Sequence, residues 1–197
     1  LSMLSAEYPP DASEIDDLVR DVDDMATLVD AFLDHARGSA EAGPAEPVAI
    51  ASFLRMIVED CRRMGQAVTL GPMIGKDGPL TDAVQMPLRT VLLRRAIVNL
   101  ISNAVRYGEQ ARLGARFGAD NLLIWIEDDG PGIPEDRRAE ALRPFARLDP
   151  ARNQDRGQGV GLGLSIAADA ARLHGGQLRF APPGHLAGLR VEIVIPR

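Results

Sequence analysis

The stretch Ile124–Asp136, with the sequence IWIEDDGPGIPED, restricts the possible folds more than any other, because an apolar run changes abruptly into a charged turn. The apolar part predicts a β-strand that ends at Asp128. Gly130 and Gly132 then flank a proline, which is more turn chemistry than a strand end needs. Two interpretations remain open: a tight strand-to-helix turn capped by an aspartate, or a ligand site. In the second, a flat ligand would contact backbone that lacks Cβ atoms, and the carboxylate would accept a hydrogen bond from it.

Alternating helices and strands surround this turn and predict an α+β fold, with a mixed sheet covered by helices on one face. The predicted helices are residues 51–64, 87–108, 135–142 and 161–174, and Pro87 is expected at the first helical position of the second one. The predicted strands are residues 67–73, 80–86, 111–117, 121–126, 177–181 and 188–195, the third and fourth forming a hairpin.

Residues 11–38 are expected to form one long helix whose apolar positions alternate in steps of three and four, as in a helical bundle. These positions are Ile15, Leu18, Val22, Met25, Val29, Phe32 and Ala36. An amphipathic helix lying on a globular core is the alternative. The expected domains are residues 1–38 as part of a helical hairpin, 39–47 as a linker and 48–197 as the globular domain.

The charge and the cysteine content restrict the possible functions. A formal net charge of −6 and a pI of about 5.1 argue against a nucleic-acid-binding surface, which is normally basic. Local amides and arginines can still bind an anion on an acidic protein. The single cysteine, Cys61, rules out a disulfide within the chain and favours a reducing compartment. We see neither a membrane span nor a signal peptide in the sequence.

Two asparagines stand out in the helix that contains NLISNAVRY. Asn99 and Asn103 are four residues apart and therefore project from one face, with Arg106 and Tyr107 near that face at the helix end. Asparagine is unfavourable inside a helix, so the pair needs an explanation. Carboxamide oxygens suit Mg²⁺, which takes few protein ligands beside phosphate oxygens. A pair of amides bonded to backbone is the alternative.

A glycine-rich stretch, GQGVGLGLSI, precedes the helix predicted at residues 161–174. Gly159, Gly161 and Gly163 leave free amides beside the positive helix end, which is an arrangement that binds phosphate. The spacing matches neither a dinucleotide-binding fingerprint nor a P-loop, and a loop without a ligand is the alternative. Upstream, Arg147 is a candidate phosphate partner, and Phe145 is expected to anchor the loop to the core.

In chain order, NLISNAVRYG, EDDGPGI, LRPFARLD and GVGLGLSI resemble the N, G1, F and G2 boxes of the ATP-binding domain of sensor histidine kinases. The resemblance covers residues 48–197 and implies the Bergerat fold, a two-layer α/β sandwich shared with gyrase B, MutL and heat-shock ATPases. Residues 11–38 resemble the second helix of the dimerisation and histidine-phosphotransfer domain of osmosensor-type kinases. Leu142 and Val160 depart from the family pattern, which often has an aromatic and a hydroxyl residue there.

The resemblance implies a role for each matching residue. Asn103 would bind Mg²⁺, Asn99 would serve metal water or phosphate, and both would be catalytic together with Arg106. Asp128, rather than Asp129, would accept a hydrogen bond from the adenine amine. The remaining residues implied to bind ATP are Arg106, Tyr107, Gly130, Gly132, Ile133, Phe145, Arg147, Gly159, Val160, Gly161, Leu162, Gly163 and Leu164.

The family transfers the ATP γ-phosphate to a histidine and then to a response-regulator aspartate. Related ATPases have a glutamate where Asn99 stands, and a neutral amide is a poor general base for hydrolysis. None of His35, His174 and His185 has the H-[DE]-x-x-x-P context of the acceptor. We therefore expect the acceptor before Leu1, and a chain that binds ATP without phosphorylating itself.

Two other functions stay open: a nucleotide-binding pseudokinase or dimerisation module without transfer, and a serine-directed anti-sigma-factor kinase of the same fold. The resemblance implies a homodimer formed through the helical bundle and a response-regulator receiver domain as partner. It also implies a cytoplasmic location for this part of the protein, with anchoring of a longer protein in the inner membrane left open.

Overall fold

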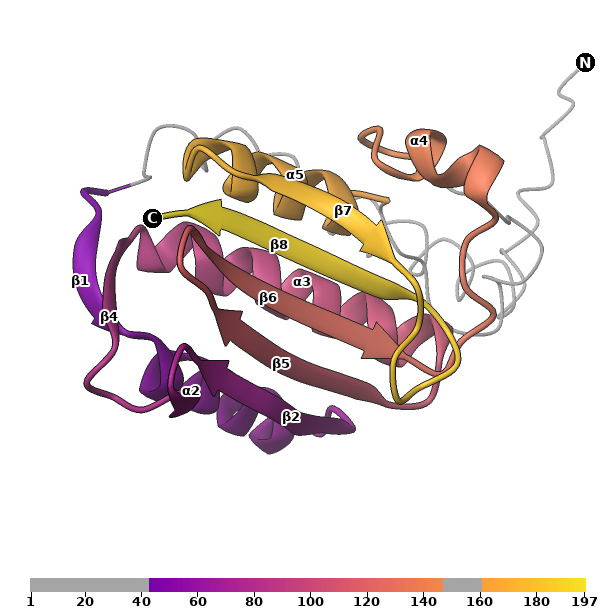
Figure 1. Cartoon of the computed structure of the whole chain (residues 1–197). Helices are drawn as coiled ribbons and strands as arrows, with labels where there is room; N and C mark the ends of the chain where they lie inside the picture. The colour runs from indigo at the N-terminus through magenta and orange to yellow at the C-terminus, as the bar shows by residue number, and fades with distance from the viewer. Residues whose placement is uncertain (1–42, 147–160) are drawn as a thin grey trace, which may run out of the picture.

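The computed structural model describes residues 43–146 and 161–197 (Figure 1). The helix predicted at residues 11–38 lies outside the described residues, as do three predicted site residues, Arg147, Gly159 and Val160. In the described part, no helix is long and apolar enough to cross a membrane.

Within the described residues, the main sheet has six strands in the order β3-β2-β5-β6-β8-β7. They are β2 (Val68–Gly75), β3 (Gly78–Pro79), β5 (Ala111–Phe117), β6 (Asn121–Asp128), β7 (Gln177–Ala181) and β8 (Arg190–Pro196). β2 and β5 are parallel, and the other neighbouring pairs are antiparallel. The mixed sheet and the hairpin of β5 and β6 are thus confirmed, and β6 continues to Asp128.

Three helices cover one face of this sheet: α2 (Ile50–Arg63), α3 (Thr90–Tyr107) and α5 (Gly163–Leu173) (Figure 1). α3 packs over β5 and β6 in the middle, with α2 against β2 and α5 against β7 and β8. A short helical segment, η1 (Glu135–Arg137) and α4 (Arg138–Ala141), follows β6. The result is the predicted two-layer α+β architecture.

Alternation along the strands explains why the helices lie on this face. Leu122, Ile124 and Ile126, every second residue of β6, belong to the hydrophobic core, whereas Trp125 points to the opposite face, where Arg190 lies over its ring. Ile97 and Ile101 of α3, four residues apart, are fully buried opposite these strands. The core therefore lies between α3 and the central strands, and it fixes the position of the C-terminal ends of both α3 and β6.

The structure corrects the sequence prediction around Pro87. The expected strand at residues 80–86 is replaced by a turn and by β4 (Gln85–Leu88), which pairs with β1 (Glu46–Ala49) in a separate two-stranded ribbon. Pro87 lies in β4 opposite Pro47, and α3 begins only at Thr90, so the expected first helical position was wrong. Proline is tolerated in such a ribbon because its strands have unpaired edges. β1 also shows that residues 46 and 47 of the expected linker belong to the folded domain.

Charged and aromatic side chains occupy the other face of the sheet. Arg190 lies with its guanidinium carbon 4.6 Å from the ring centre of Trp125. Glu127, only 1% exposed, lies near the guanidinium groups of Arg190 (3.7 Å) and Arg112 (3.8 Å). Its carboxylate also accepts hydrogen bonds from the backbone N–H of His185 at 3.2 and 3.3 Å, so the loop before β8 folds over this face.

Candidate functional site

Asp128 closes β6 and is nearly buried, with 7% of its surface exposed. Its Oδ1 accepts two backbone hydrogen bonds of 2.9 Å, from the N–H groups of Gly130 and Leu189. Burial raises the pKa of Asp128, and these two N–H donors oppose that rise. Among the described residues, no group donates a hydrogen bond to Oδ2. The side chain therefore offers one acceptor oxygen that residues 43–146 and 161–197 leave unused.

Asp129, the next residue, has a different task. Its carboxylate accepts hydrogen bonds from the backbone N–H of Glu109 (2.8 Å) and from the backbone N–H and side-chain amide of Gln110 (both 3.1 Å). These bonds, the Glu109 N–H first, lower the pKa of Asp129. Asp129 thus ties the turn after α3 to the end of β6, and it is exposed to solvent.

The end of α3 touches the glycine turn. A Cβ on Gly130 would lie 2.9 Å from the carbonyl oxygen of Tyr107, too close for any side chain. Gly132 has φ of 73°, a conformation that glycine adopts without strain. The carbonyl of Ile133 accepts a hydrogen bond from Arg138, and Tyr107 itself remains 44% exposed. Tyr107, Asp128, Gly130 and Gly132 are therefore brought together, as a purine site would require.

Asn103 lies one turn of α3 before Tyr107 and packs on the first residue of α5. A Cβ on Gly163 would lie 3.0 Å from both Cγ and Oδ1 of Asn103 and would overlap its Nδ2. The carboxamide makes no hydrogen bond to any described residue, and it is half-buried. The first-turn amides of α5 have no intrahelical partners, so an unused carboxamide lies beside a positive helix end.

Asn99 and Arg106 flank Asn103 on the same helix. The Nδ2 group of Asn99 donates to the carbonyl of Arg95, four residues earlier, at 3.0 Å. The amide nitrogen of Asn99 is therefore bonded to the backbone, as the alternative interpretation of the pair expected. Its side-chain oxygen has no bond to any described residue. Arg106 makes no ion pair with any described acid and follows Asn103 by three residues, so both project from similar directions.

Phe145 and Gly161 meet across the residues that the structure does not describe. The backbone N–H of Phe145 donates to the carbonyl of Gly161 at 3.0 Å, and Gly161 has φ of 74°. Phe145 is 47% exposed, so the expectation that its side chain anchors the loop to the core was wrong. The backbone hydrogen bond to Gly161 holds this end of the loop instead. Leu162 is buried, and Leu164 packs against the core, so both serve the base of α5 rather than an open surface.

Gly188 and Leu189 were missed by the sequence analysis, although they contact Asp128 directly. The Leu189 N–H bonds to Oδ1, and the Gly188 N–H donates to the Asp128 carbonyl at 2.9 Å. The available signal was a glycine placed immediately before an alternating apolar strand. Only the pairing of β6 with β8 shows that this glycine reaches a residue 60 positions away.

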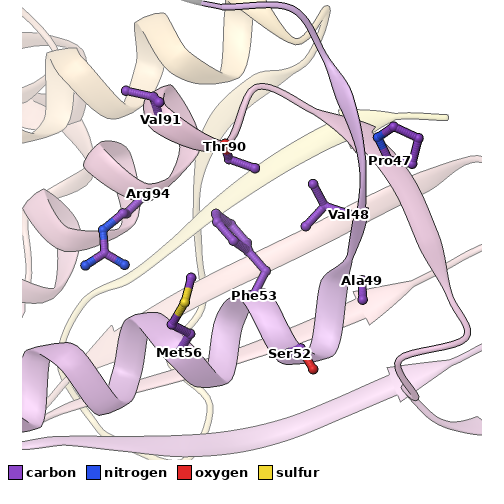
Figure 2. Close-up of a pocket in the computed structure, with 9 residues that line it drawn as sticks. All are labelled: Pro47, Val48, Ala49, Ser52, Phe53, Met56, Thr90, Val91 and Arg94. Atoms are coloured by element: carbon purple, nitrogen blue, oxygen red, sulfur yellow. The ribbon is translucent and has the colours of Figure 1, made fainter.

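A separate apolar hollow of about 520 Å³ lies between β1, α2 and the start of α3 (Figure 2). Val48 and Phe53 line it, together with the exposed side chains of Met56 and Val91 and with Arg94. None of the predicted site residues contributes to it. Arg94 is bonded to Asp60 at 2.7 Å, so the hollow offers little polar chemistry beyond apolar contact.

Residues 89–197 match the model of the family described as histidine kinase-, DNA gyrase B-, and HSP90-like ATPase. The chain is 34% identical over 178 residues to the sensor histidine kinase GtrS of Pseudomonas aeruginosa, which covers 90% of this chain and 34% of that protein. It is 38% identical over 105 residues to the sensor histidine kinase CpxA of Escherichia coli, covering 53% of this chain and 22% of that protein. The chain thus spans about a third or less of the length of these relatives.

Among solved structures, the ATP-binding domain of PrrB from Mycobacterium tuberculosis is similar, with a TM-score of 0.58 and 28% identity. The match covers 77% of this chain and 96% of that domain.

Proposed function

The chain belongs to the histidine kinase-, DNA gyrase B- and HSP90-like ATPase family, and from this we propose that it binds Mg-ATP between α3, the turn after β6 and the start of α5, and directs the γ-phosphate to a histidine. The observation that carries the proposal is a nearly buried aspartate, Asp128, with one oxygen that no described residue uses. The turn that follows it touches the end of α3 at Tyr107, and Asn103 lies one turn of that helix earlier. We propose that one nucleotide reaches from Asp128, which would recognise the purine, to Asn103, which would serve the metal and phosphates.

Asp128 is suited to recognise adenine. A carboxylate only accepts hydrogen bonds, and Oδ1 is already occupied by two N–H groups. Oδ2 can therefore accept one hydrogen bond from the amine at C6 of adenine, whereas guanine presents an oxygen at that position. Gly130 and Gly132 let the base approach the backbone, and the exposed Tyr107 ring lies at the neighbouring helix end.

We propose that Asn103 binds Mg²⁺ and that Asn99, beside it, contacts the water or phosphate around the metal. Mg²⁺ prefers oxygen ligands and usually keeps phosphate oxygens and water in its shell, so a neutral carboxamide is sufficient. When bound, the ion would neutralise phosphate charge. The first-turn amides of α5 add favourable electrostatics, and Arg106 is proposed to contact phosphate from α3. Arg147, Gly159 and Val160 are proposed to contribute from outside the described residues.

Positioning and charge neutralisation account for most of the catalysis of phosphoryl transfer. In the proposed reaction, a histidine nitrogen forms a bond to the γ-phosphorus, the bond to the β–γ bridging oxygen breaks, and ADP leaves. Asn99 is a poor base for activating water, which favours transfer over hydrolysis. A histidine from another segment or protomer would be the acceptor, and a response-regulator aspartate would receive the phosphoryl group next.

Among the described histidines, His174 is already used structurally. Its Nε2 accepts a hydrogen bond from the backbone N–H of Arg89 at 3.0 Å, and its Nδ1 lies 2.7 Å from the carbonyl oxygen of Ala170. This ring joins the end of α5 to the start of α3, so neither nitrogen is available as a nucleophile. His185 lacks the sequence context of an acceptor, so the proposal assigns the acceptor to another segment. The similarity to sensor kinases also leads us to propose a homodimer and a cytoplasmic location for this domain, in a longer protein that is membrane-anchored.

Replacing Asn103 by Ala tests the metal role. We expect the variant to lose Mg-ATP binding in calorimetry while it retains the far-ultraviolet circular dichroism of the wild type, because the wild-type carboxamide bonds to no described residue. Asn99→Ala is the control on the same helix, and a smaller loss is expected because half of its amide is already bonded to backbone. Unchanged Mg-ATP affinity in Asn103→Ala would refute the metal role.

A further inference from the structure

We propose that Gly188 and Leu189 are positioning residues that fix the Asp128 carboxylate, so that Oδ2 alone faces the nucleobase and selects purines with an amine at C6. This inference rests on the proposed function, because it concerns how the same site chooses its nucleotide. It adds a fourth chain segment, the loop before β8, to the three that supply residues from α3, the turn after β6 and α5.

Three hydrogen bonds attach Asp128 to this loop. The Asp128 N–H donates to the Leu189 carbonyl, and the Gly188 N–H donates to the Asp128 carbonyl, both at 2.9 Å. The third bond runs from the Leu189 N–H to Oδ1 of the side chain, also at 2.9 Å. The first two fix the backbone of Asp128, and the third fixes the rotation of its side chain.

The position of Gly188 leaves no room for a side chain. A Cβ there would lie 2.5 Å from the Gly130 nitrogen and 2.6 Å from the Asp128 carbonyl oxygen, and it would overlap Oδ1. Two of these atoms are backbone, and the third belongs to a short, nearly buried side chain. The backbone φ of Gly188 is not positive. Close approach, rather than an unusual backbone conformation, is therefore the reason for glycine.

Selectivity follows from this attachment. With Oδ1 accepting from both Gly130 and Leu189, rotation of the carboxylate would break two hydrogen bonds at a site with little solvent. The remaining oxygen, Oδ2, therefore points in one fixed direction and can pair only with a hydrogen-bond donor of the base. A purine without the C6 amine would leave Oδ2 desolvated and unpaired, and binding sites reject such analogues strongly.

The test compares ATP with purine riboside triphosphate, which lacks the C6 amine, for binding to the full chain with Mg²⁺. The wild type should prefer ATP by roughly 10- to 150-fold, the range expected for a hydrogen bond to a charged group. Gly188→Ala should bind both nucleotides with nearly equal affinity, because the displaced carboxylate no longer points at the amine. A general loss of folding would instead abolish the binding of both nucleotides together with the wild-type circular dichroism.

Gly184→Ala is the matched control from the same loop. A Cβ at Gly184 would approach only the ends of the long side chains of Glu127 and Arg190, on the other face of the sheet. This variant should keep the wild-type preference for ATP. If Gly188→Ala also keeps it, the inference is wrong while the proposed function stands. If the wild type binds both nucleotides equally, recognition of the C6 amine by Asp128 fails and takes the inference with it. If the wild type does not bind Mg-ATP at all, the proposed function fails.

A measurement on the unmodified chain covers the case in which Gly188→Ala does not fold. In a pH titration followed by nuclear magnetic resonance, the amide protons of Gly130 and Leu189 should shift together with the midpoint of the Asp128 carboxyl. A Leu189 amide that does not follow this titration would overturn the attachment on which the inference depends.

Discussion

Replacing Asp128 by Asn separates recognition from stability, because it changes one oxygen of the carboxylate into an amide nitrogen. The Asn oxygen should remain at the Oδ1 position, where the N–H groups of Gly130 and Leu189 require an acceptor. The amide NH₂ then occupies the position of Oδ2. A donor thus faces the proposed adenine amine, which is also a donor, and the hydrogen bond cannot form.

The expected loss of ATP affinity follows from this exchange. A hydrogen bond to a charged group contributes about 1.5–3 kcal/mol. Removing it should weaken ATP binding by roughly 10- to 150-fold in isothermal titration calorimetry. Asp129→Asn makes the same chemical change at the neighbouring residue, whose carboxylate is bonded to Glu109 and Gln110 instead. That control should bind ATP as tightly as the wild type, and equal affinities in both variants would refute the assignment of Asp128.

Stability should respond to the two substitutions in opposite directions. Burial raises the pKa of Asp128 in the folded state, so its contribution is fully present below the unfolded-state pKa and is lost as the pH rises through the folded-state pKa. Hydrogen bonds lower the pKa of Asp129, so its contribution is present above the unfolded-state pKa and is lost as the pH falls through the folded-state pKa. At pH 7, Asp128→Asn should therefore retain or raise the free energy of unfolding in urea, whereas Asp129→Asn should lower it.

Further predictions concern the scaffold. His174→Ala should lower the free energy of unfolding by about 1–3 kcal/mol in urea titrations, because it leaves the Arg89 N–H without its acceptor; an unchanged value would show that the ring does not join α5 to α3. Gly114→Ala should cost about 1–3 kcal/mol, since a Cβ there would overlap the Trp125 ring, whereas Gly118→Ala, with only ordinary contacts, should be nearly neutral. Extending the chain at its N-terminus should produce a dimer in sedimentation velocity, and a longer chain that stays monomeric would argue against the predicted bundle.

The sequence predicted the elements that depend on local pattern. The apolar run of β6, its hairpin with β5 and the glycine turn after Asp128 were recognisable because each depends on a few adjacent residues. The four-residue spacing of Asn99 and Asn103 likewise placed both amides on one helix. The packing of Asn103 on Gly163 follows from the contact between α3 and α5, which a resemblance to a family suggests and local pattern does not.

Features that depend on tertiary pairing were not predicted. Pro87 has a local sequence context typical of the first position of a helix. Its strand conformation depends instead on the pairing with Pro47, which lies 40 residues earlier in the chain. Gly188 resembles an ordinary turn glycine until β8 is paired with β6. Phe145 was expected to anchor its loop to the core, yet its side chain is about half exposed and its backbone N–H binds the carbonyl of Gly161 instead.

A crystal structure of the full chain with Mg²⁺ and a non-hydrolysable ATP analogue would show whether Asp128 recognises adenine. We expect the C6 amine about 2.9 Å from Oδ2 of Asp128 and the metal about 2.1 Å from the carboxamide oxygen of Asn103. A base whose amine points away from Asp128, or a metal bound without Asn103, would disprove the proposed site.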